Sequence, residues 1–123
     1  MSLLVIGGAG FVGANLAIHF AKSGQNVVIF DNLVRRGSEN NLERFRAHKN
    51  ITFIHGDIRC REDFYPLSEL DITQVLECSA QPTCLQGYEN PVFDFTNNTV
   101  GLVNVLEFCR SKQASIIFWS SNK

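Results

Sequence analysis

The fold of this chain is decided near its start, where residues 3–13 read LLVIGGAGFVG. A short apolar run passes into glycines at positions 7, 10 and 13, and a helical pattern follows. An apolar strand that turns through glycines into an amphipathic helix predicts a strand–turn–helix unit. We expect Gly7 to permit the tight turn, Gly10 to let the backbone approach a bound group, and Gly13 to let the helix pack closely. The apolar face of that helix is predicted to carry Val12, Leu16 and Phe20.

The same alternation continues to the end of the sequence. Further apolar runs predict strands at residues 27–30, 51–55, 72–78 and 115–119, and helical patterns cover residues 38–48, 61–66 and 91–110. In the second helix Leu42 and Phe45 should face inward, and the apolar positions of the last include Val100, Val103, Leu106 and Phe108. Strands alternating with helices predict an α/β fold, a doubly wound parallel sheet covered on both faces. The sequence ends four residues after the fifth predicted strand, so we expect a fold truncated there, the first part of something larger.

Composition limits the classes of function. The 123 residues are 45% hydrophobic and 19% charged, which predicts one globular domain rather than a disordered chain. A net charge of −1 offers no general attraction for nucleic acid or an anionic membrane. No apolar run reaches the roughly 20 residues of a membrane span, and no signal peptide is recognisable. We therefore expect a cytoplasmic protein.

The four cysteines, Cys60, Cys78, Cys84 and Cys109, are widely spaced and form no Cys-x-x-Cys pair. This spacing predicts buried reduced thiols rather than a zinc site or a redox pair.

The glycine spacing between a strand and a helix is typical of a site for a pyrophosphate, because the helix N-terminus supplies free N–H donors and a positive dipole. A tight turn without a ligand is the alternative. Asp31 ends the second predicted strand, where a carboxylate meets an adenine ribose 2′-hydroxyl, and it would repel a 2′-phosphate. NAD is therefore favoured over NADP, although Arg35 or Arg36 could accommodate that phosphate.

Two further sets of residues have competing interpretations. Asp57 ends the third predicted strand and could receive the adenine amino group, or it could simply cap a loop. A solvated face is the alternative for the basic residues Arg35, Arg36, Arg44, Arg46 and Lys49, and it is the preferred interpretation of Arg44, Arg46 and Lys49.

Several of these motifs together resemble the extended short-chain dehydrogenase/reductase family, in particular its NAD-dependent sugar-nucleotide epimerases and dehydratases. The resemblance is carried by residues 5–13 (VIGGAGFVG), 31–33 (DNL), 55–58 (HGDI), 80–81, 90–91, 94–95, 98, 101, 104–107 and 116–123. The run at 31–37 (DNLVRRG) and the ending Ser-Asn-Lys are most similar to the CDP-paratose 2-epimerases, also called CDP-tyvelose epimerases. The resemblance implies an NAD(P)-binding Rossmann fold.

The resemblance also implies roles for individual residues. Phe11 and Val12 would offer backbone N–H groups to the pyrophosphate, beside Gly7, Gly10 and Gly13. The remaining positions would hold the adenosine ribose (Asp31, Asn32, Arg35), line the adenine (Asp57, Ile58) or lie near the cofactor (Ala80, Asn98). Ser121 falls where the family places the Ser or Thr that hydrogen-bonds the sugar hydroxyl undergoing oxidation, and Ser120 is its neighbour. The alternative for Ser121 is a strand-terminal serine.

The chain also departs from the family pattern. The family usually has Thr at Ile6, His at Glu77, Ala at Ser79, Ser at Gly87 and Ser at Trp119. A buried Glu77 would need a partner or a proton. The family's catalytic Tyr with a Lys four residues later is missing, since Tyr65 is followed at that spacing by Glu69 and Tyr88 by Val92.

Together these observations predict that the chain is the N-terminal NAD-binding portion of a nucleotide-sugar epimerase or dehydratase and that it is inactive alone. In the complete enzyme NAD would accept a hydride from the sugar and return it to the opposite face, and a nucleotide sugar would be the substrate. The alternatives are a stand-alone nucleotide-binding module or gene remnant, and an NADPH-dependent reductase of the same superfamily. An uncovered sheet edge predicts self-association into a homo-oligomer. Nucleic acid, membrane and metal are not expected as partners.

Overall fold

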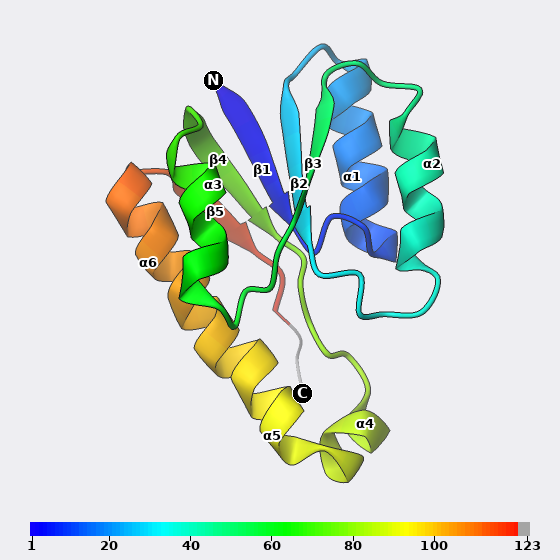
Figure 1. The fold of residues 1–123 in the computed structure, drawn as a ribbon, viewed down its shortest axis with the longest axis vertical. Helices are drawn as coiled ribbons and strands as arrows, with labels where there is room; N and C mark the ends of the chain where they lie inside the picture. The colour runs from blue at the N-terminus through cyan, green and yellow to red at the C-terminus, as the bar shows by residue number, and fades with distance from the viewer. Residues whose placement is uncertain (121–123) are drawn as a thin grey trace.

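A computed structural model describes residues 1–120 and shows one parallel five-stranded sheet (Figure 1). The strand order is β3-β2-β1-β4-β5, and every neighbouring pair is parallel. The strands are β1 (Ser2–Ile6), β2 (Val27–Asp31), β3 (Ile51–His55), β4 (Ile72–Glu77) and β5 (Ser115–Phe118). This order, with helices on both faces, confirms the predicted doubly wound fold.

The helices form two layers around the sheet. One layer comprises α1 (Phe11–Lys22), the short 3₁₀ turn η1 (Ser38–Asn40) and α2 (Asn41–Phe45). The other comprises the 3₁₀ turn η2 (Arg61–Phe64), α3 (Tyr65–Ser68) and α6 (Leu102–Lys112). Beyond the carboxyl ends of the strands lie α4 (Cys84–Glu89), α5 (Pro91–Phe95) and the π-helical turn η3 (Thr96–Gly101), which leads into α6 (Figure 1).

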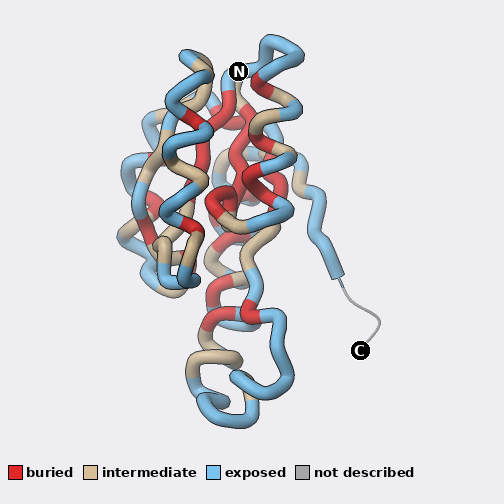
Figure 2. Tube along the Cα trace, turned by 90° about the vertical axis from the view of Figure 1, so that its right-hand side faces the viewer, coloured by how far each residue is buried: buried red, intermediate tan, exposed pale blue. Residues whose placement is uncertain are grey.

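The sheet is buried because alternate side chains of each central strand enter different cores. In β1, Leu4 and Ile6 pack toward α3 and α6, while Leu3 and Val5 pack toward α1 and α2. Figure 2 shows the buried stretches gathered in the middle of the molecule. The strand β5 and the helix α4 are mainly exposed. The best-buried part of the fold is therefore its β1–β2–β4 centre, to whose carboxyl ends the glycine loop and the segment after Glu77 are attached.

The buried face of α1 differs from the predicted one. It consists of the small residues Gly13, Ala14, Ala17 and Ala21, whereas Val12 is 44% exposed and Leu16 and Phe20 are only partly buried. A Cβ on Gly13 would lie 2.4 Å from the Gly7 carbonyl oxygen, so only a small-residue face lets the helix approach this closely.

The last helix is also turned relative to the prediction. Phe108 is buried as expected, together with Val105 and Cys109, but Val100, Val103 and Leu106 are exposed. The π-helical turn η3 adds a residue to one turn and so shifts which positions face the sheet. Other boundaries differ slightly: α2 ends at Phe45, β4 at Glu77 and β5 at Phe118, and α4 lies in a stretch predicted as loop.

Leu42 and Phe45 face inward as predicted. The cysteine prediction is wrong in part, since Cys60 and Cys84 are exposed, while Cys109 is buried; all four thiols are free. Within residues 1–120, no helix has the length and apolarity required to cross a membrane, and no group of residues is arranged to hold a metal ion.

Candidate functional site

A cleft of about 920 Å³ opens at the carboxyl ends of β1, β2 and β4. Because β1 lies between β2 and β4, the chain leaves β1 toward one face of the sheet and β4 toward the other, and a crevice forms between the two connections. Ten of the predicted binding residues line it: Gly7, Gly10, Phe11, Val12, Gly13, Asp31, Asn32, Arg35, Ile58 and Ala80.

The glycine loop forms one wall of the cleft. Gly7 has a φ of +67°, and a Cβ there would lie 2.6 Å from the Ser79 nitrogen, so glycine is required both for the turn and for the contact with the segment after β4. Gly10 precedes the first residue of α1, and its N–H donates to the Gly7 carbonyl at 3.1 Å. Among the residues that the structure describes, no side chain caps α1, and its first turn has no acidic residue, so its N–H donors face the cleft entrance without a built-in acceptor.

Asp31 ends β2 beside this loop. Its Oδ2 accepts the Ala9 N–H at 2.9 Å and its Oδ1 accepts the Leu33 N–H at 2.8 Å. A carboxylate has about four lone-pair sites, so each oxygen retains room for one further donor such as a ribose hydroxyl. Asn32, Arg35 and Arg36 continue the lining on the same side.

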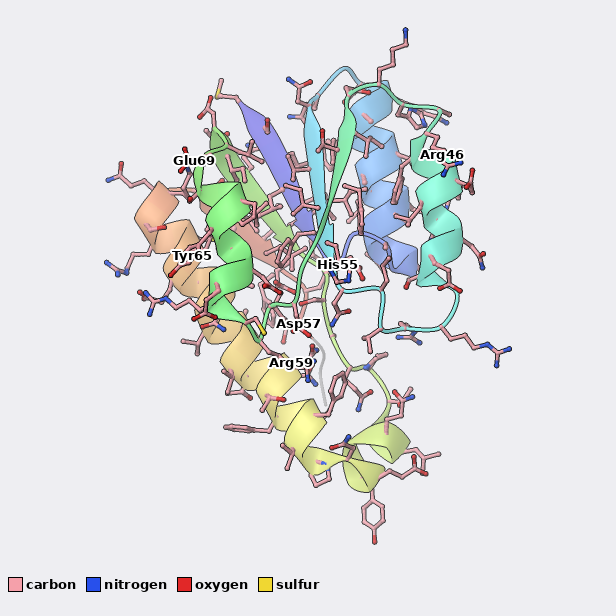
Figure 3. The ribbon with its side chains drawn as sticks, in the orientation of Figure 1. Arg46, His55, Asp57, Arg59, Tyr65 and Glu69 are labelled. Atoms are coloured by element: carbon pink, nitrogen blue, oxygen red, sulfur yellow. The ribbon has the colours of Figure 1, made fainter. Side chains whose placement is uncertain are left out.

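Asp57 is surrounded by donors from nearby residues, and its bond from the Arg59 backbone N–H matches the alternative of a loop-capping aspartate. Arg59 donates to it from Nη2 at 2.6 Å, from Nε at 3.0 Å and from the backbone N–H at 2.9 Å, and Asn32 Nδ2 adds a bond of 3.0 Å. These donors fill the acceptor sites of the carboxylate. Chiefly through the Arg59 side chain, they lower its pKa to about 2. Figure 3 labels Asp57 and Arg59, which lie next to each other. Asp57 therefore holds Arg59 and Asn32 in place, and it is not among the residues lining the cleft.

The position of Arg59 has a consequence for the far wall of the cleft. Its guanidinium carbon lies 4.9 Å from the ring centroid of Phe93, which lines the cleft from α5. Ile58 is buried and packs so closely on Gly101 that a Cβ there would lie 2.5 Å from its Cδ1. Ile58 and Phe93 thus offer fixed apolar surface where the sequence predicts the adenine. Sequence reasoning missed Phe93, because nothing in its pattern separates it from the core positions of a helix.

Two other predicted residues do not line the cleft. Asn98 is engaged with the segment after β4: its Oδ1 accepts the Gln81 N–H at 2.9 Å and its Nδ2 donates to the Gln81 carbonyl at 3.1 Å. Its neighbour Asn97, which was not predicted, lines the cleft instead. Ser120 lies after β5 and is exposed, and it too is not part of the lining. Ser121 lies outside the described residues.

Glu77, which stands where the family usually has His, is buried at the end of β4 and only 2% exposed. A carboxyl group buried this deeply needs a hydrogen-bond partner or a proton. Its Oε1 accepts hydrogen bonds from both the backbone N–H and the hydroxyl of Ser79, whereas no donor within residues 1–120 contacts Oε2. Burial raises the pKa of this carboxyl to about 7, against the opposing effect of the Ser79 bonds. Glu77 therefore supports Ser79, a cleft residue, from below.

Arg44 is exposed, as expected of a solvated face, but it also takes part in a hydrogen-bond network near the glycine loop. Its guanidinium donates to the Asn41 Oδ1 at 2.9 Å and to the Asn15 Oδ1 at 3.0 Å, and Asn41 in turn donates to the Ala9 carbonyl at 2.8 Å. Arg46 also matches the expectation, since it is exposed and pairs only with Glu43 among the described residues.

The residues present fit the ADP half of a dinucleotide. Helix N–H donors and an open position at Gly10 suit a diphosphate, the Asp31 carboxylate suits ribose hydroxyls, and Ile58 with Phe93 suits a flat base.

Comparison with known proteins also points to a dinucleotide-binding family. Residues 3–123 match the NAD dependent epimerase/dehydratase family. The chain is 36% identical over its whole length to CDP-paratose 2-epimerase of Salmonella typhi and covers 37% of that protein. It superposes on a UDP-glucose 4-epimerase of Thermus thermophilus solved with NAD at a TM-score of 0.86 and 32% identity, with 98% of this chain and 38% of the other covered.

An epimerase of Methanothermobacter thermautotrophicus superposes with a TM-score of 0.90 and 33% identity, covering 98% of this chain and 35% of that one. The chain thus spans little more than a third of the length of these relatives.

Proposed function

Because this chain belongs to the NAD-dependent epimerase/dehydratase family, we propose that its cleft binds the ADP half of NAD. The single observation that carries the proposal is the pairing of an uncapped α1 N-terminus with the Asp31 carboxylate across one glycine loop. The first-turn N–H groups of Phe11, Val12 and Gly13 offer hydrogen bonds and positive potential to a diphosphate. The carboxylate offers acceptors to a ribose that the same ligand would carry.

NAD is preferred to NADP in this proposal. The Asp31 oxygens already accept two backbone N–H groups, which keeps the carboxylate at the cleft wall where a 2′-phosphate would be repelled. Arg35 and Arg36 also line the cleft, so they are the residues that would receive such a phosphate if the preference were reversed.

The other end of the cleft, lined by residues 78–83, would face the nicotinamide. When bound, NAD supplies a hydride acceptor for transient oxidation of a sugar carbon. Ser79 is held by Glu77 beside this end, and Ala80 lines it. The family resemblance assigns Ser121 a contact with the sugar hydroxyl, and a nucleotide sugar is the proposed substrate class. Two of the relatives named above, CDP-paratose 2-epimerase and UDP-glucose 4-epimerase, are named for such sugars, and the whole-protein reaction is proposed on that basis.

Calorimetric titration of this chain with NAD, NADP, ADP and adenosine tests the proposal. We expect NAD and ADP to bind, NADP to bind at least about tenfold more weakly than NAD, and adenosine to bind weakly because it lacks the diphosphate. Tighter binding of NADP would replace the proposal with the NADPH-dependent alternative. No binding of either dinucleotide, by a sample shown to be folded by circular dichroism, would reject the cleft as a cofactor site.

Turnover is a separate measurement. We expect no epimerisation of UDP-glucose or CDP-paratose by these 123 residues, because no tyrosine in them is followed four residues later by a lysine that would lower its pKa. Detectable product from a pure sample would contradict this expectation while leaving the NAD proposal intact.

A further inference from the structure

We propose that Asn41 and Arg44 are positioning residues for the glycine loop. They hold the Ala9 carbonyl and thereby fix the direction of the first-turn N–H groups of α1. The inference rests on the proposed NAD site, because it concerns how well that loop meets a diphosphate.

Ala9 is the point at which the loop is held. The residue is completely buried, its N–H donates to Asp31, and its carbonyl accepts from Asn41 Nδ2 at 2.8 Å. The next residue, Gly10, is the last before α1, and its own N–H is held by the Gly7 carbonyl. The peptide groups that lead into the helix are therefore fixed on both sides by partners from elsewhere in the chain. Within residues 1–120, Asn41 is the only residue whose side chain donates a hydrogen bond to the Ala9 carbonyl.

Arg44 determines how Asn41 is oriented. An amide side chain presents an oxygen on one side and an NH₂ group on the other, so whichever group binds the oxygen decides where the NH₂ points. Arg44 Nη1 donates to the Asn41 Oδ1 at 2.9 Å, which leaves the NH₂ directed at Ala9. Arg44 Nη2 donates to the Asn15 Oδ1 at 3.0 Å, and Asn15 Nδ2 donates to the Phe11 carbonyl at 2.8 Å.

These bonds join α2 to both ends of the loop-to-helix junction. One path runs from Arg44 through Asn41 to Ala9, before the helix, and the other runs through Asn15 to Phe11, its first residue. The helix α2 is itself anchored to the sheet by Phe45 and Leu42, which are apolar contacts independent of this network. Removal of the polar side chains should therefore loosen the loop without detaching α2.

The chain provides a matched control immediately after the same short helix. Arg46 is exposed and pairs with Glu43 at 2.9 Å, on a surface away from the cleft (Figure 3). Arg46→Ala removes the same kind of side chain as Arg44→Ala, and any general effect of an arginine on α2 stability appears in both variants.

The test compares affinities for ADP and for adenosine, by calorimetry, in wild type and in the Asn41→Ala, Arg44→Ala and Arg46→Ala variants. Urea unfolding of each variant checks that it is folded. We expect Asn41→Ala to weaken ADP binding about tenfold and Arg44→Ala about threefold, because a buried carbonyl loses its donor or that donor loses its orientation. Adenosine affinity should change less than about twofold in both, and Arg46→Ala should change neither affinity.

A loss of affinity confined to the diphosphate ligand is the signature of loop positioning. Equal losses for ADP and adenosine in Asn41→Ala would show a merely structural role and overturn the inference, as would unchanged ADP binding in a folded variant. If Asn41→Ala fails to fold, the ratio of ADP to adenosine affinity in Arg44→Ala decides alone. Wild type that binds no ADP would instead overturn the proposed function, so the two failures are distinguishable.

Discussion

The backbone N–H of Ala9, in the glycine loop, donates a 2.9 Å hydrogen bond to Oδ2 of Asp31, at the end of β2. The other oxygen of the same carboxylate accepts the N–H of Leu33, which holds that residue at a φ of 57°, a left-handed conformation uncommon for leucine. One side chain therefore fixes two backbone turns that border the cleft. Asp31 has a structural part in shaping the cleft in addition to any contact with a ribose.

Asp31→Asn tests this double role. An amide has only one oxygen, so one of the two backbone N–H groups faces an NH₂ donor, and we expect unfolding free energy to fall by about 1–2 kcal/mol. NAD affinity should fall about tenfold, and discrimination against NADP should shrink because the repelling charge is gone. Calorimetry measures the affinities for NAD and NADP, and urea unfolding measures the unfolding free energy. Asp71→Asn is the control, since Asp71 is exposed and pairs with the chain N-terminus. Unchanged NAD affinity and unchanged preference over NADP would contradict the assignment of Asp31.

Gly10→Val tests the path of the diphosphate. Within residues 1–120, a Cβ at Gly10 would meet only the Gly7 carbonyl oxygen, at 3.2 Å, and the φ of −73° suits any residue, so the added side chain extends into the cleft. We expect NAD binding to be lost while helix content measured by circular dichroism stays nearly unchanged. Gly13→Ala is the contrasting variant, because its Cβ would lie 2.4 Å from the Gly7 carbonyl oxygen and should destabilise the fold. NAD affinity equal to wild type in Gly10→Val would reject the phosphate-loop interpretation.

The order of elements and the glycine loop could be predicted from sequence because both depend on local spacing. Gly7 and Gly13 occupy fixed positions between a strand and a helix, and each is confirmed in its predicted structural role by the contact that a Cβ would make. The buried faces of the helices were harder to predict. Periodicity selects large apolar residues, but α1 packs through Ala14 and Ala17, and the π-helical turn before α6 leaves Val103 and Leu106 exposed.

The polar contacts around the cleft could not be predicted, because they join distant segments. Asn41 reaches Ala9 across 32 residues, and no local pattern marks that pairing. The spacing of Asp57 and Arg59 is visible in the sequence, yet only the structure shows that Arg59 fills the carboxylate and covers Phe93. Residues that line the cleft were thus predictable where a motif fixes them, and missed where side-chain geometry does.

The Asp57–Arg59 pair predicts a specific response to acid. The folded-state pKa of Asp57, about 2, lies below its ordinary value of 3.8. The contribution of the ionised pair to stability is therefore fully present above pH 3.8 and is lost as the pH falls toward 2. Allowing for partial exposure, we expect that contribution to be about 1–2 kcal/mol. Arg59→Met retains a side-chain stem near Phe93 but should remove most of this pH dependence, measured by urea unfolding between pH 2 and 5. Arg61→Met, at an exposed arginine, should leave the pH dependence intact. The same dependence of unfolding free energy on pH in wild type and both variants would refute the role of the Asp57–Arg59 pair.

Glu77 predicts the opposite response, near neutral pH. Its folded-state pKa of about 7 exceeds the ordinary value of 4.5, so between these values the folded protein retains a proton that the unfolded chain has lost. Stability should therefore fall as the pH rises from 4.5 to 7, by roughly 3 kcal/mol, and stay level above pH 7. The neighbouring thiols do not titrate in this window, because burial raises the pKa of Cys78 to about 12 and that of Cys109 to about 11.

Glu77→Gln isolates this effect, since the amide keeps the shape and the Oε1 acceptor for Ser79 but carries no charge at any pH. We expect the variant and wild type to be equally stable near pH 4.5, and the variant to be more stable by roughly 3 kcal/mol at pH 8. Urea unfolding at the two pH values measures the difference. Glu43→Gln, at an exposed carboxylate that pairs with Arg46, should follow wild type at both. Were Glu77→Gln instead the less stable protein at pH 8, Glu77 would have to be ionised and paired in the folded chain, and the Oε2 atom would have to find a donor that residues 1–120 do not supply.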